Sequence, residues 1–277
     1  MSFGMWRDLS FTARIKKGII MLLRNLGFVV LALGLIIAAP TFANDAVKGE
    51  EIHFKAADGV TVYADEYLAN TGKSAPLVIL FHQAGSNARG EYGTIIPRLT
   101  ALGLSVLAVD QRSGGSYFGA SNRTVNALGH STKYCAAYPD MEAALAYAIQ
   151  NGFTGPRFAW GSSYSAALVL KLGGDHKDEL SAILSFSPGS GRAMGACNAN
   201  TYLDSVAVPV LALSPRSEMA GRKAQFARLK ERGYQTFVAE HGVHGSSMLV
   251  KSRTNADTSA TWDTVVGFLE LHGAEYK

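Results

Sequence analysis

Cysteine is scarce in this sequence: only Cys135 and Cys197 occur among its 277 residues. Two cysteines are too few for a structural zinc site, and no pair of histidines stands near either of them at the spacing of zinc ligands. We therefore expect no metal centre. The chain also lacks an internal repeat, and its length and composition fit one large globular domain.

An excess of charge of one sign is absent beyond the N-terminal segment. Five of the 26 basic residues and one of the 22 acidic residues precede position 44, so 21 of each sign remain after it. No basic cluster with interleaved aromatic residues occurs in that remainder. The sequence therefore gives no support for nucleic-acid binding.

Signatures of nucleotide-binding loops are also missing. Gly72-Lys73-Ser74 resembles the end of a P-loop, but Tyr67 stands where that motif requires glycine. The glycine-rich stretch 189–195 follows a late predicted strand and has the wrong spacing for a dinucleotide fingerprint. We therefore expect no nucleotide and no other cofactor.

The first 43 residues have the organisation of a signal peptide. A basic segment precedes an apolar run over 26–39, and Thr41-Phe42-Ala43 follows Pro40. Small residues at the −3 and −1 positions favour cleavage after Ala43. An uncleaved membrane anchor over 19–39 is the alternative, if Arg24 is tolerated within it. The pattern predicts a signal peptide over 1–43, a mature domain over 44–277, and a periplasmic or secreted protein.

An oxidising compartment favours a disulfide between Cys135 and Cys197, with two free thiols as the alternative. Cys135 lies in the glycine-rich stretch 111–138, and Cys197 lies in the glycine-rich stretch 187–200. We expect both stretches to be loops that border a substrate pocket. A disulfide would then tie two loops at the rim of the site together.

The region after position 44 alternates apolar, β-branched runs with amphipathic segments, a pattern typical of an α/β fold. It predicts a mainly parallel, eight-stranded sheet with helices on both faces and no large cap domain. In such sheets the active site lies at the carboxyl ends of the strands. The expected strands are 51–55, 60–67, 76–81, 104–109, 157–160, 180–186, 208–213 and 234–240. The expected helices are 92–102, 140–151, 164–172, 219–232 and 259–272.

Gly161-Ser162-Ser163-Tyr164-Ser165 lies between a predicted strand and a predicted helix. A nucleophile on a sharp strand-to-helix turn needs small residues two positions before and two positions after it, and Gly161 and Ser165 meet that need. The helix N-terminus behind Ser163 favours developing negative charge. By itself the motif is equally typical of a serine-rich helix cap. Its position favours Ser163 as a nucleophile.

His82-Gln83-Ala84-Gly85-Ser86 follows the predicted strand 76–81. This segment resembles the His-Gly-x-Gly loop of the α/β-hydrolase superfamily, which supplies one amide of the oxyanion hole. The resemblance implies oxyanion-hole amides at Ala84 and Tyr164 and a structural role for His82. Because Gln83 stands where the superfamily usually has glycine, the amide that points inward is left open.

An acid and a base are expected after the next strand ends, because a serine hydroxyl needs an imidazole, and the imidazole needs a carboxylate. Glu218 lies in the turn where the superfamily usually has aspartate, and Asp204 is a less favourable alternative. His244-Gly245 resembles the histidine loop that closes the fold, with His241 as the competitor. The order Ser163, Glu218, His244 is the order that this topology requires.

The resemblance covers residues 51 to 272 and is greatest to compact members without a large cap, similar to the dienelactone hydrolase-like and small esterase groups. Dienelactone hydrolases have a cysteine nucleophile where this chain has Ser163. Arg112, after the fourth strand, resembles an arginine that ties loops together. The expected function is hydrolysis of a small-molecule ester or related acyl compound. A peptidase or amidase, and an exported binding protein without activity, are the alternatives.

Overall fold

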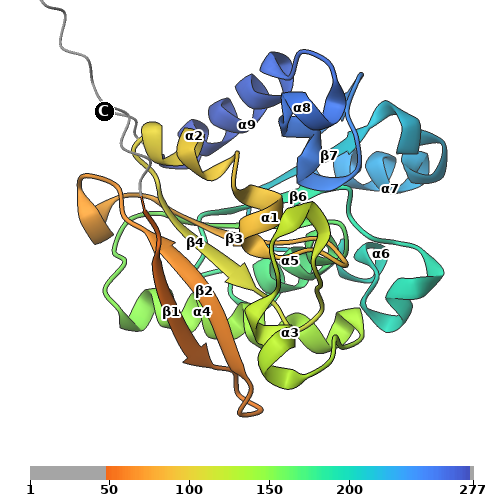
Figure 1. Cartoon of the computed structure of the whole chain (residues 1–277). Coiled ribbons are helices and arrows are strands. Elements are labelled where there is room, and N and C mark those ends of the chain that lie inside the picture. The colour runs from red at the N-terminus through yellow and green to blue at the C-terminus, as the bar shows by residue number, and fades with distance from the viewer. Residues whose placement is uncertain (1–47, 275–277) are drawn as a thin grey trace, which may run out of the picture. The chain divides into compact units, whose positions relative to one another are not determined.

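The computed structural model describes residues 48–274, so the predicted signal peptide lies outside the described residues. One eight-stranded sheet has the order β1-β2-β4-β3-β5-β6-β7-β8. Figure 1 shows β1 and β2 together at one side of it. The strands are β1 (Glu50–Lys55), β2 (Thr61–Tyr67), β3 (Leu77–Phe81), β4 (Ser105–Asp110), β5 (Arg157–Ser162), β6 (Ala182–Phe186), β7 (Val210–Pro215) and β8 (Gln235–Ala239).

Only β2 runs antiparallel to its neighbours, and every strand pair from β4 to β8 is parallel. The predicted mainly parallel sheet is confirmed. Because β3, β5, β6, β7 and β8 point the same way, the segments that follow them gather at one edge of the sheet. Ser163, Glu218 and His244 all belong to such segments.

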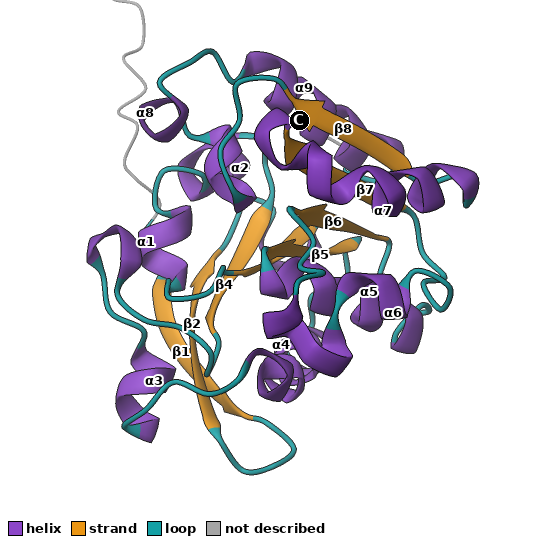
Figure 2. Ribbon diagram, turned by 90° about the vertical axis from the view of Figure 1, so that its right-hand side faces the viewer, coloured by secondary structure: helices purple, strands orange, loops and turns teal. Residues whose placement is uncertain are grey.

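Helices cover both faces of the sheet, and Figure 2 shows α4 and α5 on one side with α1 and α2 on the other. The buried residues of β3 alternate between the two cores: Leu77, Ile79 and Phe81 pack with α4 and α5, whereas Val78 and Leu80 pack with α1, α2 and α9. This period-two alternation explains why the strand is apolar at every position. The helices are α1 (Ala88–Tyr92), α2 (Ile96–Ala101), α3 (Arg123–Leu128), α4 (Tyr138–Gln150), α5 (Tyr164–Asp175), α6 (Ala199–Tyr202), α7 (Met219–Glu231), α8 (Lys251–Thr254) and α9 (Ser259–Leu271). None of the helices described within 48–274 is long and apolar enough to span a bilayer.

The single helix expected over 92–102 is wrong. The Asn87 side chain accepts a hydrogen bond from the Gly90 amide, so α1 begins earlier, at Ala88. The chain then breaks, and α2 restarts with Pro97 in its first turn. Proline fits there because the first amides of a helix have no partner within it, whereas inside a continuous helix it would break the ladder. The predicted loop over 111–138 also holds a short helix, α3, which Asn122 caps.

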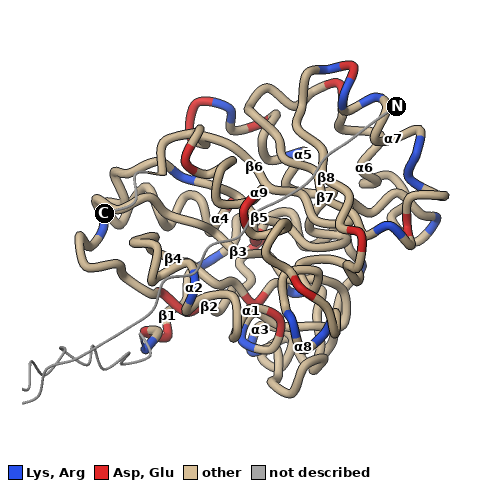
Figure 3. Tube along the Cα trace, turned by 90° about the horizontal axis from the view of Figure 1, so that it is seen from above, with Lys and Arg blue, Asp and Glu red and all other residues tan. Residues whose placement is uncertain are grey.

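Ion pairs hold the loops at the carboxyl edge of the sheet. Arg112 binds Asp140 through Nε at 2.9 Å, and Asp58 through its guanidinium, so it joins α4 to the β1–β2 turn. Asp110 accepts from the Ala88 amide at 2.8 Å and from Arg123 Nε at 2.7 Å. Figure 3 shows the basic and acidic segments of β2, α1 and α3 near one another. The pairs of Arg112 with Asp140 and Asp58 show that this arginine ties loops together.

Candidate active site

Ser163 stands between the end of β5 and the start of α5, with φ 62° and ψ −112°. A positive φ is strained for a residue with a side chain, and such strain is found at functional turns. The Ser163 amide donates to the Phe186 carbonyl at 2.8 Å, which fixes the turn against β6. The side chain is partly exposed whereas those of Ser162 and Tyr164 are buried, so the Ser163 hydroxyl is presented to solvent at the strand edge.

The residues two positions before and after Ser163 are small for different structural reasons. A Cβ atom on Gly161 would collide with the backbone carbonyl of Ser165, so only glycine fits there. Ser165 is buried, and its hydroxyl donates to the His82 carbonyl at 2.6 Å. That bond ties the Ser163 turn to the loop that follows β3. The sequence motif thus fixes both the turn and its neighbour.

Glu218 and His244 are paired across the ends of β7 and β8. His244 Nδ1 donates to Glu218 Oε1 at 2.5 Å, and Arg222 Nε donates to Glu218 Oε2 at 2.8 Å. Burial favours the neutral carboxyl, but the His244 hydrogen bond and the charges of His244 and Arg222 outweigh it and lower the pKa of Glu218. The carboxylate is therefore ionised and directs His244 Nε2 away from itself.

The competing residues lie elsewhere. His241 is exposed and, within the described chain, makes no hydrogen bond to Glu218. Asp204 is 74% exposed and pairs with Arg228 on α7 and with Arg232, which follows that helix. The structure thus pairs Glu218 with His244 rather than selecting Asp204 or His241.

Two serines that no sequence motif marks, Ser162 and Ser187, bind the His244 loop through their hydroxyl groups. The amide of Ser246 donates to the Ser162 hydroxyl at 2.9 Å, and the amide of Gly245 donates to the Ser187 hydroxyl at 3.0 Å. Ser162 precedes Ser163, and Ser187 follows Phe186, the residue that binds the Ser163 amide. Within 48–274 no hydrogen bond joins the Ser163 hydroxyl to His244.

The loop after β3 bears on the oxyanion amide that the sequence leaves open. The Gln83 amide is occupied, because it donates to Glu91 Oε2 at 2.6 Å. Among the described residues, the Ala84 and Tyr164 amides have no hydrogen-bond partner. His82 is fully buried, with Nδ1 on the Gln83 carbonyl at 2.8 Å and Nε2 accepting from the Gln111 amide at 3.0 Å. Burial lowers the pKa of His82, so the ring is neutral. Its hydrogen bonds hold the loop after β3 in place.

A cavity of about 650 Å³ opens beside this loop. The residues that line it include Gly85, Tyr134, Cys135 and Met194. A disulfide joins Cys135 to Cys197, with the Cα atoms 5.6 Å apart, and so connects the two loops of the rim.

The model of one family, described as "Serine aminopeptidase, S33", matches residues 72–224, more than half of the chain. The chain belongs to this hydrolase family. The match includes Ser163 and Glu218 and ends before His244. No curated protein sequence matches the chain.

Solved structures place this S33-family chain in the α/β-hydrolase fold. An esterase of Pyrococcus furiosus is 16% identical with a TM-score of 0.63, over 82% of this chain and 92% of that one. A carboxyl esterase of Bacillus coagulans is 12% identical with a TM-score of 0.65, over 81% and 98%. A dienelactone hydrolase of Anabaena variabilis is 11% identical with a TM-score of 0.61, over 82% and 98%. The suspected superfamily is thereby confirmed.

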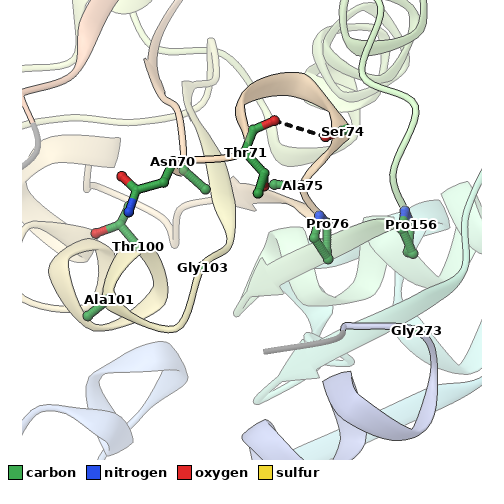
Figure 4. Close-up of a pocket in the computed structure, with 11 residues that line it drawn as sticks. Asn70, Thr71, Ser74, Ala75, Pro76, Thr100, Ala101, Gly103, Pro156 and Gly273 are labelled. Atoms are coloured by element: carbon green, nitrogen blue, oxygen red, sulfur yellow. Dashed lines mark hydrogen bonds between the residues drawn. The ribbon is translucent and has the colours of Figure 1, made fainter. Parts of the chain in front are cut away.

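A second pocket of about 450 Å³ lies far from this chemistry. Asn70, Thr71, Thr100 and Pro156 line it, and the Ser74 hydroxyl donates to the Thr71 carbonyl at its border (Figure 4). It lies where β3 and β5 begin, whereas Ser163 lies where β5 ends. Active sites of such sheets lie at the carboxyl ends of the strands, so this pocket is at the opposite edge. Within 48–274, no group of three or more His, Cys, Asp or Glu residues is arranged to hold a metal ion.

Proposed function

We propose that this chain is an exported serine hydrolase that cleaves a carboxylic ester or related acyl compound through an acyl-enzyme on Ser163. The observation that carries the proposal is the Glu218–His244 hydrogen bond, at the same sheet edge as the strained Ser163 turn. A hydrolase family and esterase neighbours of the same fold support it. A neutral small molecule or a singly charged ester would reach the site from the cavity beside it.

Acylation begins when the Ser163 hydroxyl oxygen attacks the ester carbonyl carbon and its proton passes to His244 Nε2. Glu218 accepts a hydrogen bond from His244 Nδ1–H throughout, which holds the tautomer and stabilises the imidazolium without protonation of the carboxylate. The carbonyl oxygen becomes an oxyanion that the free amides of Ala84 and Tyr164 would bind. Collapse of the tetrahedral intermediate breaks the ester C–O bond, and the leaving alkoxide takes the proton from His244.

Deacylation repeats the chemistry with water. His244 removes a proton as the water oxygen attacks the acyl carbon, and the same amides bind the second oxyanion. The intermediate then releases the carboxylic acid, and the Ser163 oxygen recovers its proton from His244. No group outside Ser163, Glu218, His244 and two backbone amides is needed for the balance of protons.

Ser163→Ala tests the proposal directly. We expect it to lower kcat on p-nitrophenyl acetate by about 10⁴-fold or more, because the covalent route is removed. Ser252→Ala, at an exposed serine of α8, is the matched control and should leave kcat unchanged. A fluorophosphonate probe should label the parent chain and not Ser163→Ala. Absence of labelling in the parent would favour a binding protein without activity.

A peptidase or amidase is the second candidate, because the family description names an aminopeptidase. The chemistry at Ser163 would be the same, with an amine as the leaving group. Comparison of kcat/KM on an alanine p-nitroanilide with that on p-nitrophenyl acetate separates the two functions. A higher kcat/KM on the anilide than on the ester would favour a peptidase or amidase over an esterase.

A further inference from the structure

The cavity beside the oxyanion loop is continuous with the residues around Ser163. Its Gly85 follows Ala84, and the ring of its Tyr134 stacks on Tyr164 with centroids 5.0 Å apart. Its Met194 contacts Gly189, whose amide donates to the Ser163 carbonyl at 3.0 Å. Three residues that line the cavity therefore lie next to the segments that carry Ser163 and the proposed oxyanion amides. A substrate held at Ser163 would place one of its two halves here.

Two cationic side chains line this cavity, and no acidic one does. They are Lys133 and Arg192, and both residues are exposed. Neither makes an ion pair or a side-chain hydrogen bond within the described part of the chain. The nearby Arg112 differs, because Asp58 and Asp140 neutralise it. The cavity thus offers two positive charges that no protein group neutralises.

The disulfide holds these two charges on one cavity. Lys133 lies two residues before Cys135, and Arg192 begins the 3₁₀ segment that ends at Cys197. The two segments are 62 residues apart at the bridge, so without it nothing local in the sequence keeps them together. A fixed pair of cations binds an anion at a lower cost in conformational entropy than two mobile ones.

We infer that this cavity binds a carboxylate or other anionic group of the substrate, held by Lys133 and Arg192. The inference rests on the proposed function and narrows it to esters that carry a negative charge on one half. Exposed ion pairs are individually weak, so the preference should be moderate and should decrease with salt.

Matched ester pairs test the inference. In one pair, 4-carboxyphenyl acetate and 4-(methoxycarbonyl)phenyl acetate differ in charge on the leaving half. In the other pair, monoethyl and diethyl terephthalate differ in charge on the acyl half. We expect higher kcat/KM for the anionic member of at least one pair. The variant Lys133→Gln/Arg192→Gln should reduce that preference about tenfold, mainly through KM, and leave the neutral esters unchanged.

Lys177→Gln/Lys223→Gln is the control, because it removes the same net charge at two exposed lysines outside the cavity. If the anionic and neutral esters are hydrolysed equally and the cavity variant changes nothing, the inference fails while the proposed function stands. If no ester is hydrolysed, the proposed function fails. Calorimetry with benzoate then tests whether the cavity binds an anion. Benzoate binding that is lost in the cavity variant supports the inference, and absence of binding in the parent chain overturns it.

Discussion

Arg222 fixes the glutamate that stands where the α/β-hydrolase superfamily usually has aspartate. Its Nε binds Glu218 Oε2 at 2.8 Å, and its Nη2 donates to the Ser187 carbonyl at 3.2 Å. A glutamate has one more rotatable bond than an aspartate, and this arginine fixes the added freedom. The Ser187 hydroxyl meanwhile accepts from Gly245, next to His244. Acid and base are therefore anchored to the same residue.

Glu218→Gln should lower kcat on p-nitrophenyl acetate by about 10²- to 10⁴-fold and change KM little. The amide keeps the shape but loses the charge that stabilises the His244 imidazolium. Glu240→Gln, which removes an exposed carboxylate paired with Arg216, is the control and should change kcat less than twofold. Equal effects of the two variants would mean that Glu218 does not orient the base.

Glu91 is a carboxyl that the proposed chemistry does not use. It is fully buried, Oε2 accepts the Gln83 amide, and Oε1 has no hydrogen-bond partner in the described chain. Burial, opposed by the hydrogen bond from the Gln83 amide and by the charge of Arg253, raises its pKa to about 7. The folded chain therefore holds this proton at pH values where the unfolded chain has lost it.

A raised carboxyl pKa stabilises the fold at low pH, and that stabilisation is lost as pH rises from about 4.5 to about 7. Relative to Glu91→Gln, the parent chain should therefore lose about 3 kcal/mol of unfolding free energy between pH 4.5 and pH 8. Urea denaturation of both chains at each pH measures the difference, in which other titrating groups cancel. A difference independent of pH would show that Glu91 titrates normally.

Sequence patterns indicate residues whose place in the topology sets their position, and miss residues whose role depends on tertiary contacts. Ser163, Glu218 and His244 follow predicted strands, so topology alone brings them to one edge. Glu91 and Ser162 act through contacts with Gln83 and Ser246, and no local pattern records that pairing. A buried glutamate in a short helix has the same local sequence pattern as an exposed one. Such supporting residues need the tertiary structure.

At the scale of elements, apolar runs predicted β3, β4, β5, β6 and β7, because buried parallel strands have few alternatives. Helices were harder where packing, rather than periodicity, sets their limits. α4 begins at Tyr138, before the expected start, because Pro139 fits the first turn and Asp140 turns inward to Arg112. The junction between β5 and α5 is the element boundary that matters most for function, since it sets the Ser163 backbone.

Gly161→Ala should disturb that junction. The added methyl group would collide with the Ser165 carbonyl, a backbone atom that cannot move without shifting α5. We expect a loss of about 2 kcal/mol or more in unfolding free energy, together with a large loss of kcat. Gly221→Ala is the control, because an added Cβ in α7 meets nothing within 4 Å. It should stabilise the chain by about 0.5–1 kcal/mol, so two decreases of similar size would contradict the steric argument.

At the scale of the whole molecule, the disulfide is connected with the predicted leader, because the leader would direct the chain to an oxidising compartment. Cys135 and Cys197 form a covalent bond in the structure, and such bonds persist in exported proteins but rarely in the cytosol. The bridge spans 62 residues, and a loop of that size gives about 4 kcal/mol of stabilisation by restricting the unfolded chain. We therefore propose that export is needed for full stability as well as for location.

Expression of the full-length chain in a secreting bacterium tests both features together. The exported protein should begin at Asn44, and its mass should rise after alkylation only if it is first reduced. Residues 44–277 made in a reducing cytosol should carry two free thiols and unfold at lower urea concentration. Oxidation of that cytosolic protein in vitro should restore the exported midpoint, because the chains are then identical. An intact leader on the exported protein would instead support the membrane anchor over 19–39, and equal midpoints with and without the bridge would remove the stabilising role of the disulfide.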